Sequence, residues 1–226
     1  MSSTSRPFDC RATAFMVCAV VVLVTAAVGI VNPPLAIALM AENSAVESLQ
    51  VVLMAAAGAL AARQGWVAIR MGRPAVIEVA VVTAMVMAAV SEVDLDRKIF
   101  GVKVIATLFF LNPKYPLAFR VLAVLVVVGV PTGVGVWLLT RWKTVREAGR
   151  RALREPWGQT GAFGAALYVL TQILEGPIDR IRWQQHHMIE ETSELVAVLC
   201  IVIAVAARHG LGARFRRAFG IRRPAR

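Results

Sequence analysis

The sequence predicts an all-α polytopic integral membrane protein, a bundle of about six transmembrane helices. Three observations predict this fold class. Hydrophobic residues make up 58% of the 226 residues, a larger share than soluble domains carry. The apolar residues gather in six stretches of about 20 residues, the length that an α-helix needs to cross ~30 Å of hydrocarbon. Basic residues are concentrated in every second connection between these stretches, as they are in multi-pass proteins.

The six predicted spans fill most of the chain and leave no room for a separate soluble domain. Helix is the expected conformation of each span, because backbone groups in lipid must be satisfied within the segment. We interpret residues 1–226 as a single transmembrane domain with a cytoplasmic basic tail at 209–226. The spans are expected at about 12–32, 45–64, 75–94, 118–140, 158–176 and 189–208.

The first apolar stretch is predicted to be an uncleaved span. It covers residues 12–32, follows Arg6 and Arg11, and is longer than the ~7–15 apolar residues of a signal peptide. Pro33 and Pro34 then end it without a convincing cleavage site.

The basic residues orient the predicted bundle. Four regions hold 18 of the 25 Lys and Arg: the N-terminus, the second-to-third connection, the fourth-to-fifth connection and the tail. The positive-inside rule makes that side cytoplasmic, so both termini are expected inside. The net charge of +11 is then explained without nucleic acid as a partner. A basic tail of this kind can also bind anionic lipid or an acidic partner.

The acidic residues gather on the opposite, outer side. A carboxylate at a membrane border is costly unless it is paired, hydrated or metal-bound, so a group drawn from several helices predicts a site. Among the acidic residues within the predicted spans, Glu78, near the inner end of the third, is the exception, and we expect it to be ion-paired or to snorkel. Ten of the 14 Asp and Glu lie outside: Glu42, Glu47, Glu92, Asp94, Asp96, Glu175, Asp179, Glu190, Glu191 and Glu194.

The sharpest local motif opens the sixth span. At about 100° per residue, His187, Glu190, Glu191 and Glu194 share one helical face. Imidazole with carboxylates suits Zn, Fe or Mn. We therefore predict these four residues, together with Glu47 from the second span, as ligands of a divalent metal.

Local helix physics offers a simpler interpretation for some of these residues. The helix dipole stabilises acidic groups at a helix N-terminus by ~0.3–1 kcal/mol, which accounts equally well for Glu190. An N-terminal capping box accounts for Glu47. The dipole benefit fades at Glu194, and it is reversed for Glu92 at the C-terminal end of the third span. We predict Glu92, Glu191 and Glu194 as catalytic residues, since neighbouring carboxylates can divide the roles of acid and base.

Three outer motifs follow one another along the chain: Glu47–Gln50, the run Ser91–Gly101, and Glu190–Glu191–Glu194. They resemble motifs in an uncharacterised group of small bacterial multi-pass membrane proteins. That group carries Glu-x-x-Gln, then Glu-Glu-x-Ser-Trp-Gly-Gln-Arg-x-x-Gly after a span, then Glu-Glu-x-x-Glu. The present chain matches the second motif at Glu92 and Arg97–Gly101 and lacks its Trp-Gly-Gln core. The resemblance implies the bacterial inner (plasma) membrane and supports the same residues, without assigning a reaction.

Small residues and cysteines are predicted to serve packing. Gly129 and Gly133 form a G-x-x-x-G in the fourth span, and Gly161 with Ala165 forms a small-x-x-x-small pair in the fifth, patterns typical of close helix approach or a kink. No C-x-x-C occurs, so the cysteines are interpreted as small buried residues. They are Cys10, Cys18 and Cys200.

The leading functional hypothesis is a metal-dependent hydrolase that acts on lipid or a lipid-linked substrate. The predicted site lies at the level of the lipid headgroups, and a bound metal activates water. One alternative is a proton or divalent-cation transporter or channel, although the middles of the spans contain almost no ionisable residue. The other is an accessory subunit of a larger membrane complex, which a copurifying protein partner would favour.

Overall fold

The computed structural model describes residues 9–40, 45–92, 115–179 and 186–210. These residues are almost entirely helical and include no strand, which confirms the all-α prediction. The helices are α1 (Cys10–Val31), α2 (Pro33–Leu39), α3 (Ala45–Arg70), α4 (Val76–Glu92), α7 (Leu117–Val124), the π-helical segment η1 (Leu125–Gly129), α8 (Val130–Thr140), α9 (Trp142–Ala152), α10 (Pro156–Asp179) and α11 (His186–Arg208).

Three of the described helices are long and apolar enough to cross a membrane: α1, α3 and the continuous rod of α7, η1 and α8. This supports a membrane protein, while the number of six crossings and their orientation stay predictions. Two of the remaining predicted spans depart from a simple apolar span. α4 has 17 residues, and α11 carries Glu191, Glu194 and Arg208.

Two predicted spans contain a change of helix direction or type. Asn32 ends α1 and begins α2: its side chain accepts from the Leu35 amide, and Pro33 occupies the first position of α2. In the fourth span, η1 lies immediately before α8, which has Pro131 near its start. A π-turn beside a proline relieves the clash that proline causes in a regular helix.

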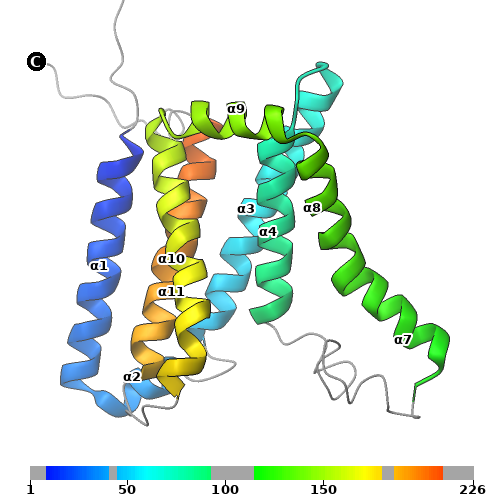
Figure 1. Ribbon diagram of the computed structural model, residues 1–226. Helices are drawn as coiled ribbons and strands as arrows, with labels where there is room; N and C mark the ends of the chain where they lie inside the picture. Colours follow the sequence, from blue (N-terminus) through cyan, green and yellow to red (C-terminus); the bar gives the residue numbers. More distant parts are fainter. Residues whose placement is uncertain (1–8, 41–44, 93–114, 180–185, 211–226) are drawn as a thin grey trace, which may run out of the picture.

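The fourth-to-fifth connection, which the sequence analysis treated only as a basic segment, folds into α9. This helix runs crosswise over one end of the bundle (Figure 1) and contacts α4, α8 and α10. Val145, Ala148 and Ala152 recur at helical spacing, and they are less exposed than Lys143 and Arg146. The amphipathic spacing was the available signal for this helix.

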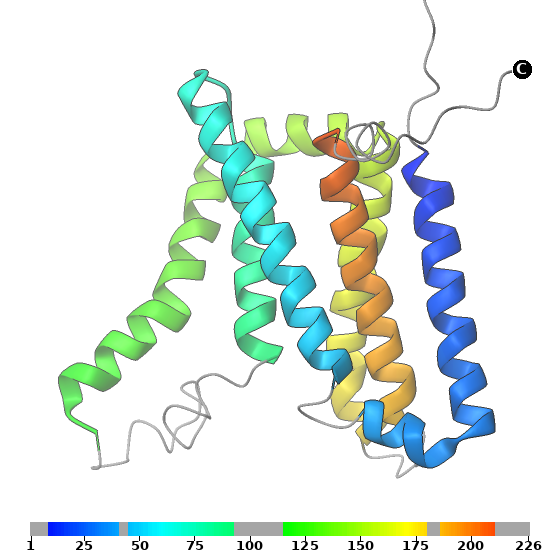
Figure 2. The same ribbon diagram turned by 180° about the vertical axis from the view of Figure 1, so that it is seen from behind.

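The bundle is built around the α10–α11 hairpin. α3 and α4 pack together, α11 contacts α3, and α1 packs on α11. Seen from behind, α11 lies between α3 and α1 (Figure 2). The α7–η1–α8 rod leans away from the other helices (Figure 1).

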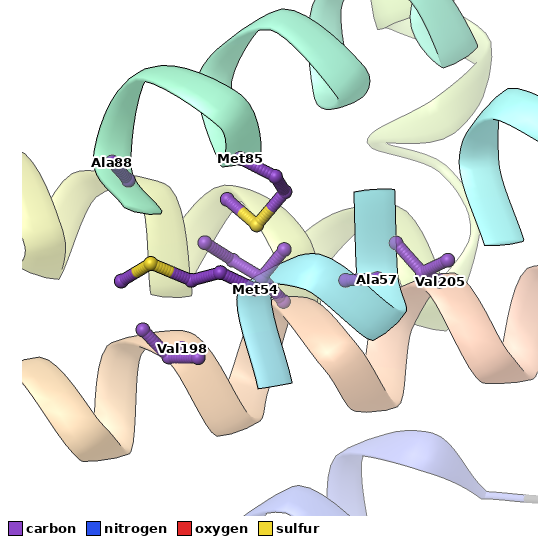
Figure 3. Packing of buried hydrophobic residues seen from close by; sticks show 7 residues of the cluster. Met54, Ala57, Met85, Ala88, Val198 and Val205 are labelled. Atoms are coloured by element: carbon purple, nitrogen blue, oxygen red, sulfur yellow. The ribbon is translucent and has the colours of Figure 1, made fainter. Parts of the chain in front are cut away.

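The apolar core lies where α3, α4 and α11 meet (Figure 3). On each helix the core residues are spaced by three, four or seven positions, so each helix contributes one face. Met54 is fully buried at the centre. The cluster consists of Met54, Ala57, Met85, Ala88, Val198, Ile201 and Val205.

Glycines on α10 allow α11 to approach closely. A Cβ atom at Gly164 would lie 2.7 Å from the Ala197 carbonyl oxygen, and one at Gly161 would lie 3.2 Å from the Ala204 Cβ. The packing role predicted for Gly161 is therefore confirmed. A Cβ at Gly133 would meet no described atom within 4 Å. The G-x-x-x-G of Gly129 and Gly133 allowed two roles, close helix approach or a kink. The π-helical segment that ends at Gly129 agrees with a local distortion of the helix. The described residues do not support close helix approach at Gly133.

Candidate functional site

Polar residues continue the core faces at one end of the bundle. Each lies one turn beyond the nearest core residue of its helix: Gln50 on α3, Glu92 on α4 and Glu194 on α11. Since the faces of these helices meet in the core, the polar residues that extend them must also come together.

Three carboxylates form the centre of this group. One carboxylate oxygen from each of Glu92, Glu191 and Glu194 lies within 4.8 Å of the others. Glu194 is 4% exposed, and the other two side chains are half-buried. A divalent cation at ~2.0–2.6 Å from each oxygen would fit among atoms this far apart. These are the three residues that the sequence analysis predicted as catalytic, and the structure brings them together.

Two glutamine amides hold the carboxylates. The Gln50 Nε2 donates to the Glu191 carbonyl oxygen at 3.1 Å and to the Glu191 Oε2 at 3.3 Å. The Gln172 Nε2 donates to the Glu194 Oε1 at 2.7 Å. We call Glu92, Glu191, Glu194, Gln50 and Gln172 the carboxylate cluster. It draws on α3, α4, α10 and α11.

Gln50 carries an observation of its own. Its side chain is 0% exposed, and its Oε1 has no hydrogen-bond partner among the described residues. A buried polar atom left unsatisfied costs ~1–3 kcal/mol. The Nε2 of the same amide donates to Glu191, so this unsatisfied oxygen belongs to a side chain that contacts the carboxylate group.

The other predicted metal ligands are not all placed by the structure. Glu47 and Glu190 are half-buried and close enough to Glu191 for their charges to act on it, but neither belongs to the group within 4.8 Å. His187 lies in the first turn of α11, and its side chain lies outside the described residues, as does that of Glu175. The roles of Glu47, Glu190 and His187 as ligands stay predictions. The stretch that includes Asp94 and Asp96 also lies outside the described residues.

Gln172 was missed by the sequence analysis. It lies within the apolar run of α10, at a position that no local motif marks. An amide within the apolar part of the span was the available signal, because such groups usually bond to a neighbouring helix.

The opposite end of the core also holds a carboxylate, and there its charge is paired. Glu78 on α4 forms a salt bridge with Arg208 on α11, with side chains 9% and 24% exposed. The Arg208 guanidinium lies 4.6 Å from the Trp157 ring centre, a cation–π contact with α10. The expectation that Glu78 is ion-paired is confirmed. Burial, and next the Arg208 charge, lower the pKa of His209 from its ordinary value, which favours the neutral imidazole beside the pair.

No protein-family model, no curated protein and no solved structure matches this chain. A function can therefore rest only on the residues of the site and their chemistry.

Proposed function

We propose that this protein is a six-span membrane protein whose carboxylate cluster binds a divalent cation and hydrolyses a lipid or a lipid-linked substrate. The observation that carries the proposal is the convergence of Glu92, Glu191 and Glu194 within 4.8 Å. The fully buried amide of Gln50 beside them supports it independently. With both termini cytoplasmic, the cluster would lie at the outer ends of the helices, level with the lipid headgroups.

The donor atoms favour a hard cation. Carboxylate and amide oxygens suit Mn²⁺, Mg²⁺ or Ca²⁺ better than Zn²⁺, which prefers imidazole or thiolate ligands. Within the set of Zn, Fe and Mn, the described oxygens therefore favour Mn. An imidazole from His187 would shift that preference toward Zn or Fe.

Hydrolysis at such a site would need a bound cation, a base that accepts a proton from water and an acid that returns it to the leaving group. A divalent cation held by Glu92, Glu191 and Glu194 would supply Lewis acidity for activating water, and the Glu191 carboxylate would accept the proton of that water. The water oxygen would add to the ester carbon or phosphorus as the bond to the leaving oxygen breaks, and the carboxyl group would return the proton to that leaving oxygen. We assign Glu194 as a ligand held by Gln172, and Glu191, held by Gln50, as a ligand that also serves as the base, consistent with the hydrogen bonds that each receives.

The transporter alternative fits the bundle less well. Glu78 and Glu92 lie 14 positions apart on α4, about 21 Å of helix. Between them the centre of the bundle is packed with Met54, Met85 and Val198 (Figure 3). A conducting path for cations needs polar groups near mid-depth, and the core places apolar side chains there.

The deciding experiment measures metal in the full-length protein purified in detergent, by elemental mass spectrometry. We expect about one equivalent of a divalent metal in the wild type and in E147Q, whose exposed carboxylate lies on α9 beside Arg151. The metal should be lost in E191Q and E194Q, which remove ligand charge. Preparations containing metal are then assayed for hydrolysis of phospholipid and lipid-linked esters.

Two outcomes would contradict the proposal. Wild-type metal content in both E191Q and E194Q would remove the cluster as the binding site. Absence of metal from the wild type would leave the transporter and the accessory subunit, and a stable copurifying protein would then favour the subunit.

A further inference from the structure

A second feature lies on the other side of α11, away from the carboxylate cluster. A cavity of about 670 Å³ opens between α1, α10 and α11. α1 and α10 meet at their first turns, where the Cys10 Sγ and Thr160 Oγ1 are 3.7 Å apart. Further along, the Cys18 and Cys200 Sγ atoms are 3.5 Å apart and form part of the wall. We call this cavity the α1 groove.

The lining of the α1 groove changes from polar to apolar along its length. Arg11, Gln159 and Thr160 line it in the first turns of α1 and α10. Beyond them the walls are apolar. Phe15 and Leu23 from α1 stand at the rim with 76% and 68% of their side chains exposed.

The dimensions match one leaflet of a bilayer. Arg11 and Leu23 are 12 positions apart on α1, which is about 18 Å of helix. Half of a ~30 Å hydrocarbon core is ~15 Å. A transmembrane helix from a second copy would need an apolar surface along the full thickness, whereas this groove ends at an arginine.

We propose that the α1 groove binds one anionic phospholipid, with an acyl chain along the apolar walls and its phosphate beside Arg11. Three properties support this occupant. The charged side chain lies at one end only, the exposed aromatic and aliphatic rim opens sideways to where lipid would be, and the length corresponds to one chain. Basic pockets between transmembrane helices recognise anionic headgroups by this combination of charge and apolar contact.

The test is native mass spectrometry of the full-length protein in detergent, with phosphatidylglycerol and phosphatidylcholine of identical acyl chains as probes. We expect one phosphatidylglycerol to be retained more tightly than phosphatidylcholine. R11Q should lower the affinity for phosphatidylglycerol about fivefold, as expected for the loss of one basic residue. The affinity for phosphatidylcholine should be unchanged. A19W places a large side chain in the groove and should lower the affinity for both lipids about tenfold or more. The reason is that each acyl methylene excluded from the groove loses ~0.8 kcal/mol of binding free energy.

V20W is the matched control, because Val20 is exposed on the same helix and does not line the groove. Equal affinities in A19W and V20W, or no preference for the anionic lipid in the wild type, would overturn the proposal. A wild-type dimer that A19W converts to monomer would also overturn it, by assigning the groove to a second copy. If A19W does not fold, the R11Q result decides.

The lipid and metal measurements fail independently, because Val196 and Cys200 face the groove while Glu194 lies on the opposite face of α11.

Discussion

The two ends of the apolar core differ in how they hold carboxylates. At one end a single carboxylate, Glu78, meets the guanidinium of Arg208, which also stacks on Trp157. At the other end Glu92, Glu191 and Glu194 meet one another within 4.8 Å. Opposite charges that are paired within the protein form a structural contact between α4 and α11. Like charges gathered at one point repel, and a cation or a proton would relieve that repulsion, which is why we propose this end as the binding site.

The largest effect is expected from breaking the Glu78–Arg208 pair. E78Q or R208M alone should lower the free energy of unfolding by about 3–5 kcal/mol, because each leaves a buried charge without its partner. The double variant E78M/R208M should recover most of this loss, since an apolar pair needs no charge partner. Thermal unfolding in detergent measures all three. A double variant as unstable as the sum of the single variants would show that the ion pair is not the cause.

At the carboxylate cluster, stability should depend on added metal. Mn²⁺ at about 100 times its dissociation constant should stabilise the wild type by ~2.7 kcal/mol, because a ligand that binds only the folded state shifts the equilibrium. E194Q should lose this stabilisation, whereas E78M/R208M should keep it. Unfolding curves with Mn²⁺ and with excess chelator give both values. Equal stabilisation of E194Q and the wild type would remove the distinction between the two ends.

The third prediction concerns the helix contact that positions the cluster. G164A should destabilise the protein by about 1–3 kcal/mol, the usual effect of overpacking, because the new methyl group would lie 2.7 Å from the Ala197 carbonyl oxygen. G133A is the control, since a Cβ there meets no described atom within 4 Å. The displacement of α10 from α11 should also weaken Mn²⁺ binding. Identical stability of the two variants would contradict the close α10–α11 contact.

The smallest effect is expected at Gln172. Q172M removes the hydrogen bond to Glu194 and should cost ~0.5–1.5 kcal/mol. The same change should weaken Mn²⁺ binding, because the carboxylate loses the amide that orients it. Gln64→Met, on the distant part of α3, provides a comparison for replacing an amide with a thioether. A loss of stability without a loss of Mn²⁺ affinity would give Gln172 a packing role only.

Much of the site could be predicted from local physics. Glu92 and Glu194 were singled out because the helix dipole does not account for a carboxylate at either position. Glu191 followed from its place on the same helical face as Glu194. Glu78 was expected to be ion-paired because it stands near a membrane border. Its partner could not be chosen, since Arg208 was one of several basic residues that the positive-inside rule explains equally well.

What the sequence by itself determined was the helical class, the apolar stretches and the face on which each polar residue lies, because periodicity and hydropathy are properties of the chain alone. The tertiary structure decided which faces meet. The meeting of Glu92 with Glu191 and Glu194, the reach of Gln172 from α10, and the α1 groove depend on contacts between helices far apart along the chain. Periodicity repeats within one helix and carries no information on its neighbour, so only packing, through glycines such as Gly164 and the Met54 core, could choose among the pairings.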